Sequence, residues 1–283
     1  MNPERRRRLL SSVFVAFCAG SVLVALVPLG LVLYYVASQG LSAVNLNFFT
    51  QMPQPVGETG GGMANAIAGT LIVSGLAACM AVPIGILSGI YAAEYAGGRF
   101  ATLVRLAADT LNGVPSIVIG LFAYIAAVLP FRRFSALAGG FALGIMMIPI
   151  IARTTEELLL LVPSSIREAA LALGASRTRA VFSVVVPAAL PGIVTGVVLA
   201  FARIAGETAP LLFTAFNNRF FSTRLDQPIS TLTVQVFTYA TGPYPDWRRQ
   251  AWAGALVLVS IVLVCSLLAR LATRRLERMH AGE

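Results

Sequence analysis

The sequence predicts an all-α membrane protein with six transmembrane helices. Three observations predict this class: 57% of the 283 residues are hydrophobic, only 12% are charged, and long apolar segments recur along the chain. Soluble domains average about 25% charged residues. Each apolar segment has at least about 20 residues, enough to cross a hydrocarbon core as a helix. The segments lie near residues 11–37, 63–93, 106–130, 136–161, 183–212 and 251–271.

The first segment follows four consecutive arginines, Arg5 to Arg8, and lacks a small-residue cleavage site. Such a site marks a cleaved secretory signal. We therefore expect residues 1–37 to form a cytoplasmic tail and a retained first helix. Residues 38–62 carry several prolines and glycines, which favour an exposed loop on the periplasmic side.

The distribution of arginines predicts the orientation of all six segments. With a cytoplasmic N-terminus and alternating crossings, most basic residues fall on the inner side, as the positive-inside rule requires. Both termini are then cytoplasmic, and the net charge of +9 reflects membrane topology rather than nucleic-acid binding. The inner arginines are Arg5, Arg6, Arg7, Arg8, Arg99, Arg105, Arg153, Arg167, Arg177, Arg179, Arg270, Arg274, Arg275 and Arg278, and the outer ones are Arg132, Arg133, Arg219, Arg224, Arg248 and Arg249.

Prolines lie in four of the five later segments, which together form a five-helix core within residues 63–271. Pro83, Pro115, Pro149 and Pro191 each predict a kink, because proline removes a helical hydrogen bond. Broken helices can mark transport sites, but a kink can also only shape helix packing. A periplasmic segment is expected at 213–250 and a basic cytoplasmic tail at 272–283.

The periplasmic segment has an ambiguous internal pattern. Ile229, Leu232 and Val236 fit one face of a helix. Leu232, Val234 and Val236 alternate as in a strand.

Every basic residue apart from the single histidine is an arginine, and the chain contains no lysine. A phosphate-cradling loop of the G-x-x-x-x-G-K-[ST] type needs its lysine. The chain is therefore not predicted to be an enzyme, and any ATP must be hydrolysed by a partner. Cys18, Cys79 and Cys265 lie in apolar segments as packing residues, and neither they nor His280 form a metal or cofactor site.

The inner segment 162–180 is predicted to form two short helices. Ser164 and Ser165 are candidate N-caps, and Gly174 ends the first helix. Its small apolar face suits docking into a groove of another protein. An ordinary amphipathic loop at the membrane surface is the alternative.

This segment also resembles a known motif. Glu168-Ala169-Ala170, then Gly174, then Val184-Val185-Val186-Pro187 is similar to the E-A-A-x3-G-x9-I-x-L-P loop of ABC importer permeases of the MetI-like family, with valine at the two aliphatic positions. The resemblance implies that Glu168, Ala169, Ala170 and Gly174 couple the chain to a cytoplasmic ATPase.

Three further stretches resemble the permeases of phosphate importers: 62–70, 112–120 and 202–215. The last is most similar to the PstA group of these permeases, and Arg153-Thr154-Thr155-Glu156 fits the same group. The resemblance implies an inner-membrane subunit surrounded by lipid. It also implies three kinds of partner: two copies of a PstB-like ATPase, a PstC-like sister permease and a PstS-like periplasmic phosphate-binding protein.

Arg203 lies within an otherwise apolar segment, where an arginine costs about 2.5–3.5 kcal/mol on insertion scales. Its planar fork suits phosphate oxygens. We predict a substrate pathway in which Arg203 receives the anion from outside and Arg153 passes it inward. Glu207 is expected to hold Arg203 in place and to distinguish a protonated oxyanion from sulfate. The alternatives are structural pairs, Arg203 with Glu207 and Arg153 with Glu157.

Three functional alternatives remain. The chain can transport another oxyanion, or it can serve as a membrane scaffold for phosphate signalling. A lone ion-coupled carrier would need its own acidic residues within the membrane, and Glu207 is the only strong candidate.

Overall fold

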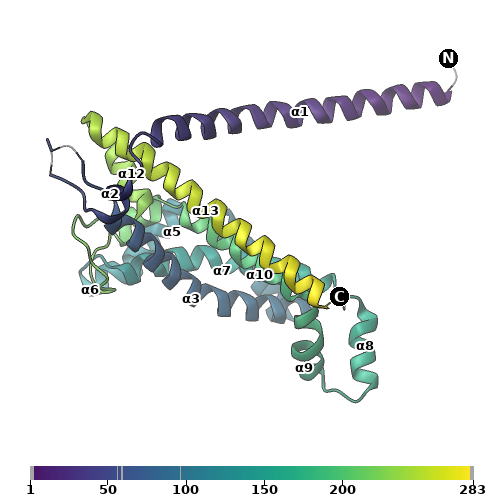
Figure 1. Cartoon of the computed structure of the whole chain (residues 1–283). Coiled ribbons are helices and arrows are strands. Elements are labelled where there is room, and N and C mark those ends of the chain that lie inside the picture. The colour runs from purple at the N-terminus through teal and green to yellow at the C-terminus, as the bar shows by residue number, and fades with distance from the viewer. Residues whose placement is uncertain (1–2, 56, 59, 96, 281–283) are drawn as a thin grey trace.

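The computed structural model describes residues 3–55, 57–58, 60–95 and 97–280, and every regular element in these ranges is helical (Figure 1). The all-α prediction is confirmed. The elements are α1 (Pro3–Gly40), α2 (Leu46–Thr50), α3 (Ala64–Glu94), α4 (Arg99–Gly113), α5 (Ser116–Ala123), η1 (Tyr124–Val128), α6 (Leu129–Phe131), α7 (Ala136–Leu160), α8 (Ser164–Ala172), α9 (Arg177–Ala180), η2 (Val181–Val185), α10 (Val186–Ala205), α11 (Ala209–Thr214), α12 (Leu232–Ala240) and α13 (Pro245–His280).

Five helical stretches are long and apolar enough to cross a membrane: Leu10–Gly40, Ala64–Glu94, Ala136–Leu160, Arg177–Ala205 and Pro245–Leu268. The sixth predicted span, 106–130, is a broken pair. Arg99–Gly113 and Ser116–Phe131 meet at an angle of 106°. The break falls at Val114, which is extended because the following Pro115 disfavours a helical conformation. Counted as one span, the pair completes the six that the sequence predicts.

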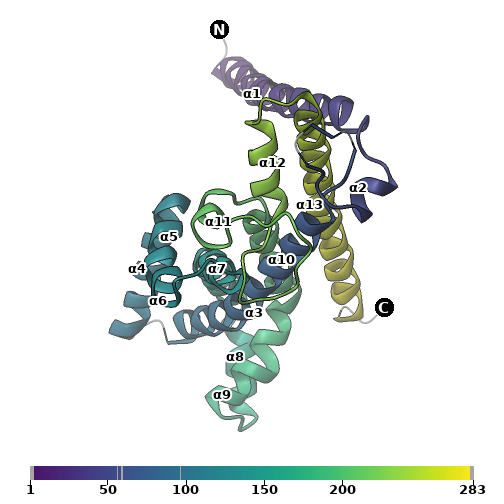
Figure 2. The same ribbon diagram turned by 90° about the vertical axis from the view of Figure 1, so that its left-hand side faces the viewer.

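The core of the bundle is a close pair of parallel helices, α3 and α7, crossed by α10 (Figure 2). Glycines allow this approach: a Cβ at Gly85 would lie 2.7 Å from the Cβ of Ile151. Small residues at helix contacts bring backbones close together in membrane proteins. Further along α7, a Cβ at Gly192 of α10 would lie 2.8 Å from the side chain of Leu158. The three helices therefore form one tightly packed unit.

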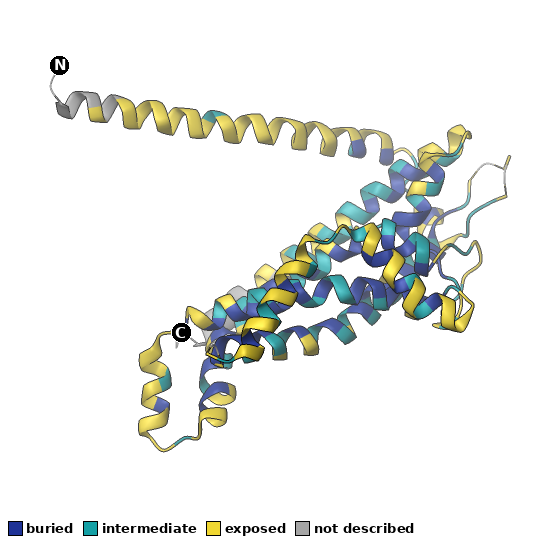
Figure 3. Cartoon of the chain, turned by 180° about the vertical axis from the view of Figure 1, so that it is seen from behind, coloured by how far each residue is buried: buried dark blue, intermediate teal, exposed yellow. Residues whose placement is uncertain are grey.

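Helix α1 leaves this bundle. It meets α13 near Gly40, where a Cβ would lie 2.8 Å from the carbonyl oxygen of Trp252. The apolar window within Leu10–Gly40 is 0% buried, and most of α1 is coloured as exposed in Figure 3. The C-terminal part of α13 lies near α8 and α9, whereas the N-terminal part of α1 lies far from them (Figure 1). The last three residues of the predicted tail 272–283 lie outside the described residues.

Pro83, Pro149 and Pro191 lie inside helices that continue through them, and Pro115 follows the break at Val114. The segment 213–250 contains a helix, α12, and the strand alternative is wrong. Its first residues are buried, and the N–H of Leu232 donates to Thr70 Oγ1 of α3 at 2.8 Å.

Candidate functional site

Arg203 lies in the last turn of α10, and its side chain is exposed. Within the ranges that the structure describes, this side chain makes no hydrogen bond or ion pair. A guanidinium without a carboxylate partner keeps all five N–H donors available for an anion.

The expected pair between Arg203 and Glu207 is not formed. Helix α10 ends at Ala205, earlier than the predicted boundary near residue 212. Gly206 is a weak helix former, and Pro210 cannot donate to the carbonyl four residues before it. Glu207 therefore lies beyond the helix end, where the i, i+4 spacing no longer aligns side chains. It is partly buried, and its backbone carbonyl accepts a hydrogen bond from Thr233 Oγ1 at 2.9 Å.

Arg153 has a different environment, because two carboxylates hold it. Its Nε lies 2.9 Å from Asp109 Oδ1, and its Nη1 lies 2.7 Å from Glu156 Oε2. Glu156 is 3% exposed and also pairs with Arg105. Arg105 in turn donates to the carbonyl of Ala92 at 2.6 Å. The result is a chain of charges, Arg105–Glu156–Arg153–Asp109, that joins α4 to α7.

The sequence prediction missed this network. It offered Glu157 as the structural partner of Arg153, but Glu157 is exposed and the ion pairs of Arg153 are with Glu156 and Asp109. Two spacings indicate the network in retrospect. Glu156 is three residues from Arg153 on one helix face, and Arg105 and Asp109 are four residues apart on α4.

The two predicted path arginines lie at different levels of the bundle. The contacts of Gly192 with Leu158 and of Gly196 with Thr154 fix the antiparallel register of α10 and α7. In this register the level of Arg153 matches that of residue 197. Arg203 is six residues further along α10, a separation of about 9 Å along the axis at the helical rise. The structure thus separates the two arginines along the bundle and does not join them in one site.

The predicted coupling segment contains the short helix α8 and the helical turn α9, which project from the end of the bundle (Figure 1). The second predicted helix is not separate, because α9 continues through η2 into α10 as one helix, Arg177–Ala205. Glu168 and Ala169 are exposed, whereas Ala170 is buried. Gly174 ends the turn after α8 with a φ of 84°, a conformation that favours glycine. The serine caps are a wrong prediction, because Pro163 is the N-cap of α8. Leu173 is 89% exposed, so an apolar side chain remains uncovered at the tip.

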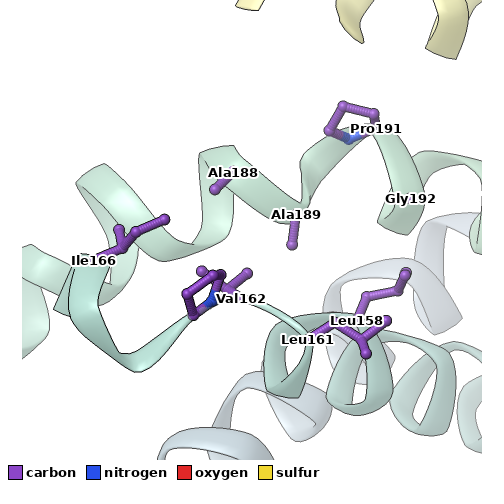
Figure 4. Close-up of a pocket in the computed structure, with 9 residues that line it drawn as sticks. Leu158, Leu161, Val162, Ile166, Ala188, Ala189, Pro191 and Gly192 are labelled. Atoms are coloured by element: carbon purple, nitrogen blue, oxygen red, sulfur yellow. The ribbon is translucent and has the colours of Figure 1, made fainter.

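An open groove of about 330 Å³ lies where α7, α8 and α10 meet (Figure 4). Its walls are apolar, and none of the three predicted path residues lines it. The lining residues are Leu158, Leu161, Val162, Pro163, Ile166, Ala188, Ala189, Pro191 and Gly192.

At the opposite end of the molecule, exposed charges neutralise one another. Arg133 Nη1 and Arg224 Nε each lie 3.2 Å from a carboxylate oxygen of Asp226. The hydrogen bond from Arg224 lowers the pKa of Asp226. Arg133 is therefore not an unpaired charge that could attract anions to this face.

Comparison with known proteins decides the family. Residues 81–279 match the model of the binding-protein-dependent transport system inner membrane component. The "Phosphate transport system permease protein PstA" of Yersinia pestis is 43% identical over 267 residues, which cover 93% of this chain and 90% of the relative. The chain belongs to the PstA family. The PstA protein of Haemophilus influenzae is 44% identical over 89% of each chain, and PstA 1 of Mycobacterium tuberculosis H37Rv is 37% identical over 95% of this chain and 91% of the relative.

Solved structures confirm the MetI-like fold of this PstA family member. An inward-facing form of the MetNI methionine ABC transporter superposes with a TM-score of 0.60 at 18% identity, covering 76% of this chain and 94% of the other. A bacterial alginate ABC transporter gives 0.62 at 15% identity and 96% coverage of both chains. The chain is a multi-pass inner-membrane permease subunit and not an enzyme. Such permeases work with an ATPase and a periplasmic binding protein.

Proposed function

We propose that this chain conducts inorganic phosphate as one permease subunit of an ATP-driven importer. The observation that carries this proposal is the 43% identity to a phosphate transport permease along 93% of the chain. The proposed assembly contains two copies of a PstB-like ATPase, a PstC-like sister permease and a PstS-like periplasmic phosphate-binding protein. In this assembly both termini and α8–α9 face the cytoplasm, and α12 faces the periplasm.

The absence of lysine supports an external source of energy, because no phosphate-cradling loop of the lysine-containing type can exist in this chain. The segment α8–α9 is the proposed seat for the ATPase. It carries Glu168, Ala169, Ala170 and Gly174 of the resemblance motif, and it presents the uncovered Leu173 at its tip. An exposed apolar side chain beside charged ones is typical of a surface that another protein covers.

The proposed path for phosphate uses the two arginines in sequence. Arg203 is exposed and has no partner among the described residues, so an arriving anion meets no competing carboxylate on its guanidinium. Arg153 is held by Asp109 and Glu156, and an anion must compete with both for its donors. We therefore assign capture to Arg203 and a weaker, transient contact to Arg153. Weak binding at the second arginine suits release toward the cytoplasm.

Glu207 supplies selectivity in this proposal. Phosphate that keeps a proton can donate a hydrogen bond to a carboxylate, whereas sulfate is fully ionised and meets repulsion. We expect Glu207→Gln to lower the ratio of phosphate to sulfate uptake by about 10-fold, the value of one hydrogen bond to a charged group. The measurement is uptake of each labelled anion by membranes that carry the whole importer. Glu58→Gln, at an exposed outer position, serves as the control, and a wild-type ratio in Glu207→Gln would remove this role.

The substrate itself is tested by competition. Membranes that carry the complete assembly should take up labelled phosphate, and unlabelled sulfate in excess should leave that uptake unchanged. If sulfate is transported as well as phosphate, the chain serves a broader oxyanion importer and the proposal is wrong in its substrate.

A further inference from the structure

One buried residue, Glu94, contacts both α8 and α9 of the coupling segment, through its side chain and its backbone carbonyl respectively. Glu94 is the last residue of α3, and its side chain is only 7% exposed. Arg167 of α8 donates to Glu94 Oε1 from Nε at 3.1 Å and lies within 3.0 Å of it through Nη2. Arg177 of α9 donates to the backbone carbonyl of the same residue. Both helices therefore meet at Glu94.

All three nitrogens of the Arg167 guanidinium are engaged within the chain. Besides Glu94, it donates from Nη1 to the carbonyl of Val162 and from Nη2 to the carbonyl of Leu159, each at 2.6 Å. These carbonyls lie at the C-terminal end of α7, where backbone acceptors are otherwise unpaired and a cation is favoured. Arg167 thus ties three elements together: α3 through Glu94, α7 through its last carbonyls, and α8 through its own backbone.

The second arginine is positioned as firmly. The guanidinium carbon of Arg177 lies 4.8 Å from the centre of the Tyr95 ring, a cation–π contact. Tyr95 stacks on Tyr91, with ring centres 5.2 Å apart. This ring pair and Glu94 hold Arg177 against the end of α3. By contrast, the apolar side chains of α8 are poorly covered, with Leu171 48% exposed and Ile166 36% exposed. The segment is therefore held on the bundle by its continuity with α10 and by the polar contacts at Glu94, and burial of the apolar side chains of α8 contributes less.

Helix α3 leads from this point to the opposite end of the molecule. It has 31 residues, a length of about 46 Å. At its far end a Cβ on Gly69 would collide with the carbonyl oxygen of Ser230, and Thr70 accepts from the N–H of Leu232. Thr233, the residue after Leu232, donates from its hydroxyl to the backbone carbonyl of Glu207. A continuous series of contacts therefore runs from α8–α9 along α3 to Glu207, which follows the end of α10, the helix that carries Arg203.

We propose that Glu94 is a positioning residue that transmits movement of the ATPase-bound segment α8–α9 to α3, and so converts ATP hydrolysis into transport. The inference rests on the proposed seating of the ATPase on α8–α9. Energetic coupling between distant sites is carried by packed elements that are linked by salt bridges and hydrogen bonds. Glu94 provides such a link in this chain, because its side chain binds α8 and its backbone carbonyl binds α9.

The test compares uptake with hydrolysis in the reconstituted complete importer. Glu94→Gln keeps the size of the side chain and removes its charge. We expect phosphate transported per ATP hydrolysed to fall about 10-fold, while binding-protein-stimulated hydrolysis and assembly with the ATPase persist. Glu58→Gln is the control for loss of one negative charge and should keep the wild-type ratio. A wild-type ratio in Glu94→Gln would overturn the inference.

Two further variants separate coupling from folding. Glu94→Asp keeps the charge and shortens the reach by one methylene, so it should give an intermediate ratio; if Glu94→Gln fails to assemble, a wild-type ratio in Glu94→Asp overturns the inference. The double variant Glu94→Gln with Arg167→Gln should transport no less phosphate per ATP than the weaker of the two single variants, because each change removes the same ion pair. Loss of phosphate uptake by the wild-type complex would instead contradict the proposed function.

Discussion

Replacing Arg203 with glutamine is expected to reduce phosphate uptake by about 100-fold or more, because two hydrogen bonds from a charged donor contribute about 3–6 kcal/mol together. The side chain is exposed at the end of α10 and has no carboxylate partner in the described part of the chain. Its loss therefore removes a free cation rather than one half of an ion pair, and the protein should still fold and assemble. The measurement is initial uptake of labelled phosphate at equal amounts of assembled complex.

Two variants sharpen this result. Arg203→Lys keeps the charge but loses the planar fork, so we expect uptake between that of the wild type and that of Arg203→Gln. Arg248→Gln changes another exposed arginine and should leave uptake unchanged. Wild-type uptake in Arg203→Gln would show that phosphate does not use this guanidinium.

Replacing Glu156 with glutamine is expected to destabilise the chain by about 2–3 kcal/mol. Breaking a fully buried ion pair costs about 3–5 kcal/mol, and the partial exposure of both arginines reduces the penalty. Glu156 is 3% exposed and neutralises Arg105 and Arg153, whose side chains are 26% and 32% exposed. The variant leaves two positive charges facing an amide. Thermal unfolding in detergent should show a midpoint lower by about 5–10 °C.

Glu157 provides the matched control for this prediction. It is the neighbouring glutamate on α7, but it is exposed and has no ion pair in the part of the chain that the structure describes. Glu157→Gln should therefore change stability by less than about 0.5 kcal/mol. Equal midpoints for the Glu156 and Glu157 variants would show that the charged network does not stabilise α4 against α7.

The sequence predicts the long helices because hydrophobic length alone specifies a membrane span. It also predicts the short helix α8, since Gly174 ends it, whereas α9 is the first turn of the long helix Arg177–Ala205. The Arg203–Glu207 pairing was wrong because charge spacing assumes a continuous helix, and here Gly206 and Pro210 end it. Gly206 and Pro210 could have indicated from the sequence alone that the helix ends before Glu207.

Other features could not be predicted from local patterns. Arg105 is 51 residues from Glu156 in the chain, and Glu94 is 73 residues from Arg167. Such pairs depend on which helices the fold brings together. The same limit applies to α12, where the apolar pattern fitted a helix and a strand equally, and burial against Thr70 of α3 accompanies the helical form.

The proposed importer can be reconstituted from purified components to measure ATP-driven phosphate uptake. The chain would be purified with its sister permease and ATPase, placed in lipid vesicles, and supplied with the periplasmic binding protein and labelled phosphate. We expect uptake that requires ATP, stops when the ATPase is omitted, and falls by about 100-fold or more when Arg203 is replaced by glutamine. Uptake that continues without ATP and without the ATPase would contradict this expectation.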